Sequence, residues 1–99
     1  MRMMLKVVIP VDAGNKAIKD GSLPRIIEAT IARLKPEAAY FFAEDGKRTG
    51  LFFFDMADGS QVPAIAEPLF MGLNAALTMK PVMNPDDLKK GLAEAAKNF

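Results

Sequence analysis

The chain has 99 residues, 51% of them hydrophobic and 25% charged, which is typical of one globular domain spanning residues 1–99. Thirteen basic and twelve acidic residues leave a net charge of +1, so bulk electrostatics gives no attraction to nucleic acid or to a membrane surface. The absence of Cys and His excludes disulfides, thiolate nucleophiles, Cys- or His-based transition-metal sites and the usual haem ligand, and we expect no cofactor.

The N-terminal segment over residues 1–9 is apolar but lacks the uninterrupted core of a signal peptide. Lys6 and Pro10 interrupt the apolar run, and Asp12 ends it. No stretch elsewhere approaches the roughly 18 apolar residues that cross a membrane. We therefore expect a cytoplasmic protein that has no membrane partner.

The first part of the chain predicts a strand followed by a helix. Residues 3–9 are rich in Val, Ile and Met and stop at Pro10, which favours a strand. Residues 11–21 are predicted to form a connection that includes a short helical turn over residues 15–20. From Ser22 onward, apolar residues recur at the spacing of one helix face, and Pro36 ends the pattern.

The next part predicts a hairpin, a helix and a strand. Residues 37–43 and 50–56 are rich in aromatic side chains and flank a polar, Gly-containing turn over residues 44–49. This pattern predicts a β-hairpin, then a helix from Ser60 and a fourth strand over residues 75–83. The predicted order of strands and helices is β-α-β-β-α-β.

The same three-residue segment, Asp-Gly-Ser, occurs at the start of both predicted helices. Asp20-Gly21-Ser22 and Asp58-Gly59-Ser60 each supply a turn and a Ser, which we predict to accept a hydrogen bond from free N–H groups of the helix start. Each copy lies between two predicted strands, so the chain is predicted to consist of two βαβ halves. Right-handed crossovers then place both helices on one face of a four-stranded antiparallel sheet, the α+β arrangement called ferredoxin-like.

A further helix is predicted to close the chain. Asn84 suits the cap, Pro85 suits the first helical position, and the acidic Asp86 and Asp87 lie at the positive end of the helix dipole. The apolar residues that this helix is expected to bury are Leu88, Leu92, Ala95, Ala96 and Phe99.

Both faces of the predicted sheet are apolar, although one of them meets no helix. Strand alternation places Phe41 on the opposite face from Tyr40 and Phe42, and it separates Phe53 from Phe52 in the same way. An uncovered aromatic face exceeds the apolar patch that monomers in water usually expose. We therefore predict a homodimer that packs sheet against sheet.

With this element order and two apolar sheet faces, the chain resembles the dimeric α/β-barrel superfamily, in which ferredoxin-like chains face each other across a two-fold axis and enclose a cavity. Residues 78–88 (TMKPVMNPDDL) and 35–41 (KPEAAYF) are similar to those of small uncharacterised bacterial proteins of this type. The superfamily includes antibiotic-biosynthesis-type monooxygenases, muconolactone isomerases, haem-degrading enzymes and regulatory ligand-binding domains. The resemblance therefore implies a cavity between two sheets, but no single activity.

Lone charges inside two predicted strands are the first candidates for ligand binding. Lys6 and Lys80 lie on neighbouring strands and together would hold a small carboxylate or enolate. Tyr40 would orient the ligand through its hydroxyl, while Phe52 and Phe54 would line the apolar wall. The alternative is that Lys80 only protects an edge strand and that the aromatic residues belong to the core.

Asp55, which ends the predicted third strand, and Lys80 are the two candidates for moving a proton in catalysis. The alternative for Asp55 is that it only shapes the following turn. Arg48, in the polar hairpin turn, would clamp an acidic ligand bidentately or is simply solvated.

Three functions stay open from the sequence. The first is binding of a small apolar or acidic molecule between the two sheets of a homodimer. The second is a cofactor-independent isomerase or monooxygenase, and the third is a structural dimerisation module. Cavity volume separates the third function from the other two, because an interface filled by side chains leaves no space for a ligand.

Overall fold

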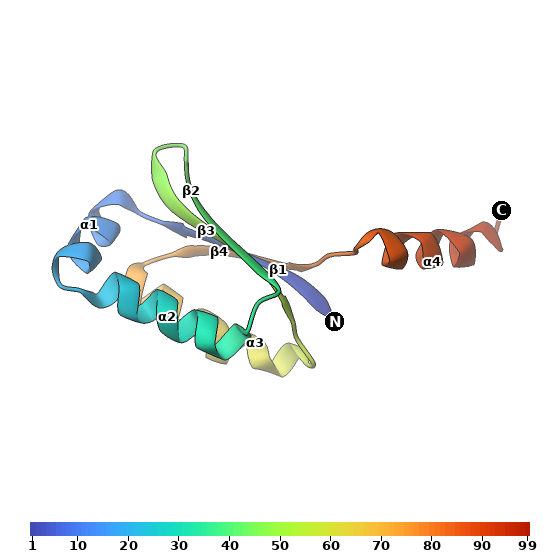
Figure 1. Cartoon of the computed structure of the whole chain (residues 1–99), viewed down its shortest axis with the longest axis horizontal. Helices are drawn as coiled ribbons and strands as arrows, with labels where there is room; N and C mark the ends of the chain where they lie inside the picture. The colour runs from blue at the N-terminus through green and yellow to red at the C-terminus, as the bar shows by residue number, and fades with distance from the viewer.

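The computed structural model covers residues 1–99 and consists of one four-stranded sheet and four α-helices (Figure 1). The strands are β1 (Arg2–Ile9), β2 (Ala38–Glu44), β3 (Lys47–Asp55) and β4 (Ala76–Pro81). The helices are α1 (Val11–Lys19), α2 (Ser22–Leu34), α3 (Val62–Leu73) and α4 (Pro85–Ala96), with a short 3-10 helix η1 (Gly59–Gln61) leading into α3. No helix is both long enough and apolar enough to span a membrane.

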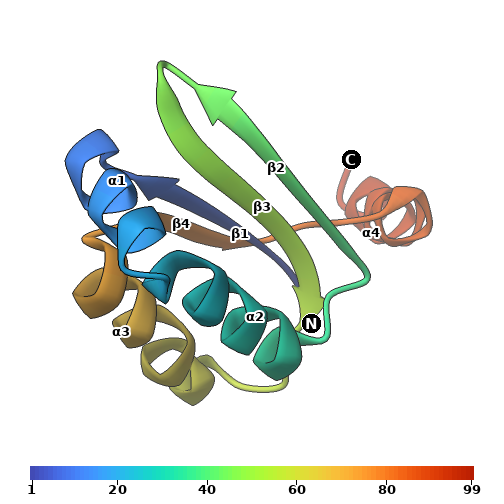
Figure 2. The same ribbon diagram turned by 60° about the vertical axis from the view of Figure 1, so that its left-hand side comes forward.

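All strands of the sheet pair antiparallel, in the order β2-β3-β1-β4. This order confirms the predicted ferredoxin-like arrangement, because β1 and β3 are central while β2 and β4 are the edges. Helices α1, α2 and α3 cover one face of the sheet, and no helix covers the other (Figure 2).

The hydrophobic core lies between the sheet and the helices on its covered face. Alternate residues of β1, from Met3 to Ile9, are buried there, while the residues between them are only half-buried. Helix α3 comes close to α2 at Gly72, where a Cβ atom would lie 2.7 Å from Cδ1 of Ile26. The largest side chains that are fully buried are Leu5, Val7, Phe52, Phe54, Leu69 and Leu73.

Helix α1 replaces most of the connection that the sequence predicts over residues 11–21. It begins directly after Pro10, which has extended backbone, and its buried residues are Gly14 and Ala17. The prediction of a connection is therefore wrong, although α1 contains most of the helical turn predicted over residues 15–20. The segment is short and contains Gly14 and Asn15, which disfavour helix, and the two residues that α1 buries, Gly14 and Ala17, contribute little apolar area.

The two Asp-Gly-Ser segments share one hydrogen bond, although their backbones differ: Gly21 has a φ of +79°, whereas Gly59 begins the 3-10 helix η1 without positive φ. The backbone N–H of Ser22 donates to the Asp20 carboxylate at 2.8 Å, and that of Ser60 donates to the Asp58 carboxylate at 2.9 Å. The predicted Ser caps are therefore wrong: the acceptor is the Asp, and Asp58 completes a capping box with Gln61. Hydrogen bonds from Ser22 and Ser60 hold the pKa of both Asp carboxyls below their ordinary value, because they favour the charged form.

Helix α4 projects away from the other elements (Figure 1), and the whole chain is 55 Å long but only 18 Å thick. Its start confirms the prediction, since Asn84 accepts from the N–H of Asp87 at 2.8 Å and the Asp87 carboxylate accepts from the N–H of Asn84 at 3.1 Å. However, no residue of α4 is buried, and Leu92 is 60% exposed. The expected burial of its apolar side is wrong within one chain, because no other element packs against that side.

Candidate functional site

By strand pairing, the face of the sheet that carries no helix (Figure 2) holds four of the residues that the sequence singles out, namely Lys6, Tyr40, Asp55 and Lys80. We call this surface the open face. It is apolar along its middle, where Met4, Leu51 and Phe53 are half-buried, and it ends at the exposed ring of Tyr40 on edge strand β2. By strand pairing its residues include Arg2, Met4, Lys6, Val8, Tyr40, Phe42, Leu51, Phe53, Asp55, Thr78 and Lys80.

The structure brings Lys6 and Lys80 together on the open face. Lys6 lies opposite Thr78, so that Lys80 is its diagonal neighbour on edge strand β4. The ammonium group of Lys6 forms a salt bridge with the carboxylate of Glu44, whereas Lys80 forms none. Lys80 is therefore the unpaired positive charge of this face, and Tyr40 lies on the opposite edge of the sheet.

Asp55 lies at the end of β3, paired in register with Arg2. Its carboxylate accepts a hydrogen bond from the amino group of Met1 at 2.7 Å and is largely exposed. Strand β1 separates Asp55 from β4, and no ion pair joins Asp55 to Lys80. The geometry therefore does not assemble the two predicted catalytic residues into one acid–base pair.

Phe52 and Phe54 lie on the covered face and not on the open face. Their exposed fractions are 0% and 2%, and they pair in register with the buried Leu5 and Met3 of β1. Their predicted role as ligand-lining residues between two sheets is corrected to a role in the core. Sequence alternation cannot make this distinction, because Leu51 and Phe53 on the other face are just as apolar.

Arg2 fixes the place where α4 leaves the sheet. Its side chain donates to Glu37 at 2.9 Å and to Asp87 in the first turn of α4 at 2.6 Å. The hydrogen bond with Glu37 is the main cause that raises the pKa of Arg2. Like the shifts at Asp20 and Asp58, this one arises from hydrogen bonds that fix local structure.

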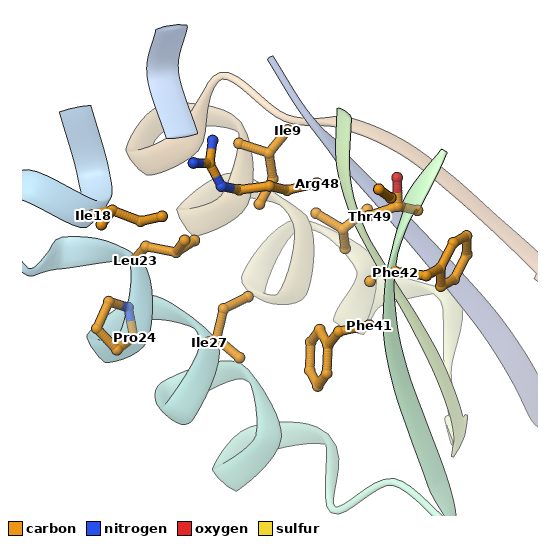
Figure 3. A pocket seen from close by; sticks show the side chains of 12 residues that line it. Ile9, Ile18, Leu23, Pro24, Ile27, Phe41, Phe42, Arg48 and Thr49 are labelled. Carbon is orange, nitrogen blue, oxygen red and sulfur yellow. The ribbon is translucent and has the colours of Figure 1, made fainter. Parts of the chain in front are cut away.

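A separate apolar hollow of about 560 Å³ lies on the covered side of the sheet, beneath the β2-β3 hairpin (Figure 3). Its one charged lining residue is Arg48. Sequence reasoning does not reveal this hollow, because its walls come from β1, β2, β3, α1 and α2, which only the fold brings together. The one local sequence feature that points to this hollow is Arg48, which lies close to the aromatic residues of the hairpin.

The strand order and the one-sided helix layer define this chain as a ferredoxin-like α+β protein. Among solved structures, it is similar to a formyltetrahydrofolate deformylase from Pseudomonas putida KT2440, with a TM-score of 0.56 and 10% sequence identity. The match covers 83% of this chain but 29% of the deformylase, so the chain spans less than a third of that protein. At this identity the similarity shows the fold alone. No family model matches the sequence, and no curated protein matches it.

Proposed function

We propose that this protein is a homodimer of the dimeric α/β-barrel type that holds a small apolar or acidic molecule between the open faces of its two sheets. The proposal rests on the solvent-accessible surface area of the single chain, which is larger than expected for a monomer of this mass. A compact monomer of 10.8 kDa is expected to expose about 5,500 Å². This chain exposes 6651 Å², which is about 1,100 Å² more.

The surplus has the size of a dimer interface. A stable interface of standard size removes about 800 Å² from each partner, and obligate dimers remove more. Among the apolar surfaces that nothing in the chain covers are the open face and the stripe of α4 that contains Leu88 and Leu92. Figure 2 shows α4 on the other side of the sheet from α1, α2 and α3, which is the side of the open face. A second copy would therefore cover both surfaces at once.

Polar groups at the edges of the open face favour an acidic ligand. Lys80 on β4 has no acidic partner, and Tyr40 on β2 exposes 61% of its surface. Both side chains lie on edge strands, so in a dimer they line the margins of the space between the sheets. A carboxylate bound there would neutralise Lys80 in a partly desolvated setting, where such a pairing is strong. Binding is favoured over catalysis because Asp55 does not join Lys80.

Native mass spectrometry of protein purified without denaturation tests the proposal, since one spectrum reports subunit number and retained small molecules. We expect a dimer with a reproducible additional mass, which Lys80→Gln reduces. Tyr40→Glu places a charge on the open face and is expected to yield monomers. Met71→Glu, an exposed position on α3, is the matched control and leaves the dimer intact. A bare dimer would favour the dimerisation module, and a monomer at micromolar concentration would overturn the proposal.

A further inference from the structure

The hollow beneath the hairpin, which we call the hairpin pocket, is a second and differently built site. Ile9 of β1 and Gly50 of β3 line its sheet side, Ile27 of α2 lines its helix side, and Phe41 of β2 lies across from Ile27 (Figure 3). Its volume of about 560 Å³ falls within the range of small-molecule sites, about 300–1,000 Å³. The pocket lies on the covered side of the sheet, and of its lining residues in the sheet only Phe42 and Thr49 alternate toward the open face, so its walls are formed within one chain.

The aromatic side of the pocket is held in place by its neighbours. Phe41 packs edge-on against the fully buried Phe52, with ring centres 5.6 Å apart and planes at 82°. Gly50 makes room for this pair, because a Cβ atom there would lie 3.1 Å from one ring and 3.3 Å from the other. Even so, Phe41 is 56% exposed although it faces the helix side of the sheet. The ring of Phe41 is therefore fixed by Phe52 and yet exposed toward the pocket, where it can contact an apolar ligand.

Arg48 supplies the single charge of the pocket. Its guanidinium donates from Nη2 to Oδ1 of Asn15 on α1 at 3.1 Å, and no carboxylate forms a salt bridge with it. Gly14 on the same helix permits this position, because a Cβ atom there would lie 2.6 Å from Nη1 of Arg48. Arg48 is thus a half-buried residue whose guanidinium is oriented by a neutral amide and forms no salt bridge.

We propose that the hairpin pocket binds a monocarboxylic acid with an apolar body. The carboxylate pairs with the guanidinium of Arg48, whose two parallel N–H donors match a carboxylate. The apolar body lies between Ile27 and Phe41. One positive charge among apolar walls suits one negative charge, whereas a phosphate or a polyanion would need further donors that this pocket does not present.

Calorimetric titration with sodium decanoate below its micelle concentration tests the pocket, with 1-decanol as the neutral probe of the same length. Decanoate is expected to bind more tightly than decanol, because only the acid can pair with Arg48. Arg48→Gln is expected to weaken decanoate binding roughly tenfold or more and to leave decanol binding unchanged. Lys47→Gln removes a neighbouring charge that does not line the pocket, and it is expected to leave both affinities unchanged.

A second variant changes the pocket without touching its charge. Gly14→Ala is expected to displace the guanidinium and weaken decanoate binding while the helix is retained, since Ala favours helix over Gly. Amide resonances of Gly50 and Ile27 are expected to shift on titration, as read by two-dimensional NMR. Equal binding of decanoate and decanol, or an unchanged affinity in Arg48→Gln, would overturn the inference. Shifts confined to Tyr40 and Lys80 would also overturn it, while supporting the site on the open face.

Discussion

Asp58 accepts hydrogen bonds from Ser60 at the entry to η1 and α3, and an ionised carboxylate accepts them more strongly than a neutral acid. Its pKa in the folded chain is therefore held below the ordinary 3.8. By linkage, ionised Asp58 contributes its full stabilisation of the fold above about pH 5. This stabilisation is lost as the pH falls through the folded-state pKa, which lies below 3.8. Asp58→Ala is expected to lower the Tm at neutral pH, and circular dichroism melts should show that deficit shrinking at about pH 3.

The control for this prediction is Asp58→Asn, which keeps an oxygen that can cap the helix but removes the charge. Its Tm is expected to lie between those of the wild-type protein and Asp58→Ala at neutral pH. A deficit for Asp58→Ala that is the same at neutral and acidic pH would show that its ionised carboxyl contributes nothing.

Neighbouring Phe residues on β3 should differ sharply in their contribution to stability. Phe52 is 0% exposed in the core, so Phe52→Ala is expected to cost about 3–5 kcal/mol in the free energy of unfolding. Phe53 is half-buried on the open face, and Phe53→Ala is expected to cost less in a dilute sample. Urea denaturation of both variants measures the difference. The reverse order would mean that the faces of β3 are assigned the wrong way round.

At the scale of elements, the β2-β3 hairpin depends on two residues with left-handed backbone. Asp45 and Gly46 have φ angles of +53° and +76°, as a two-residue hairpin turn with the favoured twist requires. Because nothing lies near a Cβ atom at Gly46, Gly46→Ala isolates the backbone strain and is expected to cost about 1 kcal/mol. Gly59→Ala, equally open but without positive φ, is the control and should not destabilise the fold. Equal melts for the two variants would contradict the assigned turn.

The sequence predicts most elements because their signals are local. Aromatic runs around a Gly turn define the hairpin, and Asn84 with Asp87 defines the start of α4. Where the prediction fails, the deciding contact is distant or weak. Helix α1 buries Gly14 and Ala17, which give little hydrophobic signal, and the choice between two apolar faces of β3 is made by helices elsewhere in the chain. The hairpin pocket belongs to the same group, since Arg48 becomes part of a site only when α1 and α2 lie beside it.

At the scale of the whole molecule, the outstanding feature is a helix without a surface to pack on. Isolated helices shorter than about 12–15 residues are marginal in water, and α4 has 12 residues, none of them buried. Its capping box and the Arg2–Asp87 ion pair fix only its first turn. The apolar residues farther along α4 therefore need a contact from outside the chain, and the proposed dimer would provide it.

Whether α4 depends on contact with a second copy can be measured on the intact chain. If a second copy covers α4 and the open face, folding is coupled to association, and Tm should rise with protein concentration. Replacing Leu88 and Leu92 together by Lys is expected to abolish that rise, because the charges would oppose burial of the α4 stripe, while the core of each chain is unaffected. Met71→Lys adds a charge at an exposed position on α3 and should retain the rise. A wild-type Tm independent of concentration over a hundredfold range (about 2.7 kcal/mol in a linked equilibrium) would mean that neither surface is buried by association, and α4 would then be expected to fray in solution.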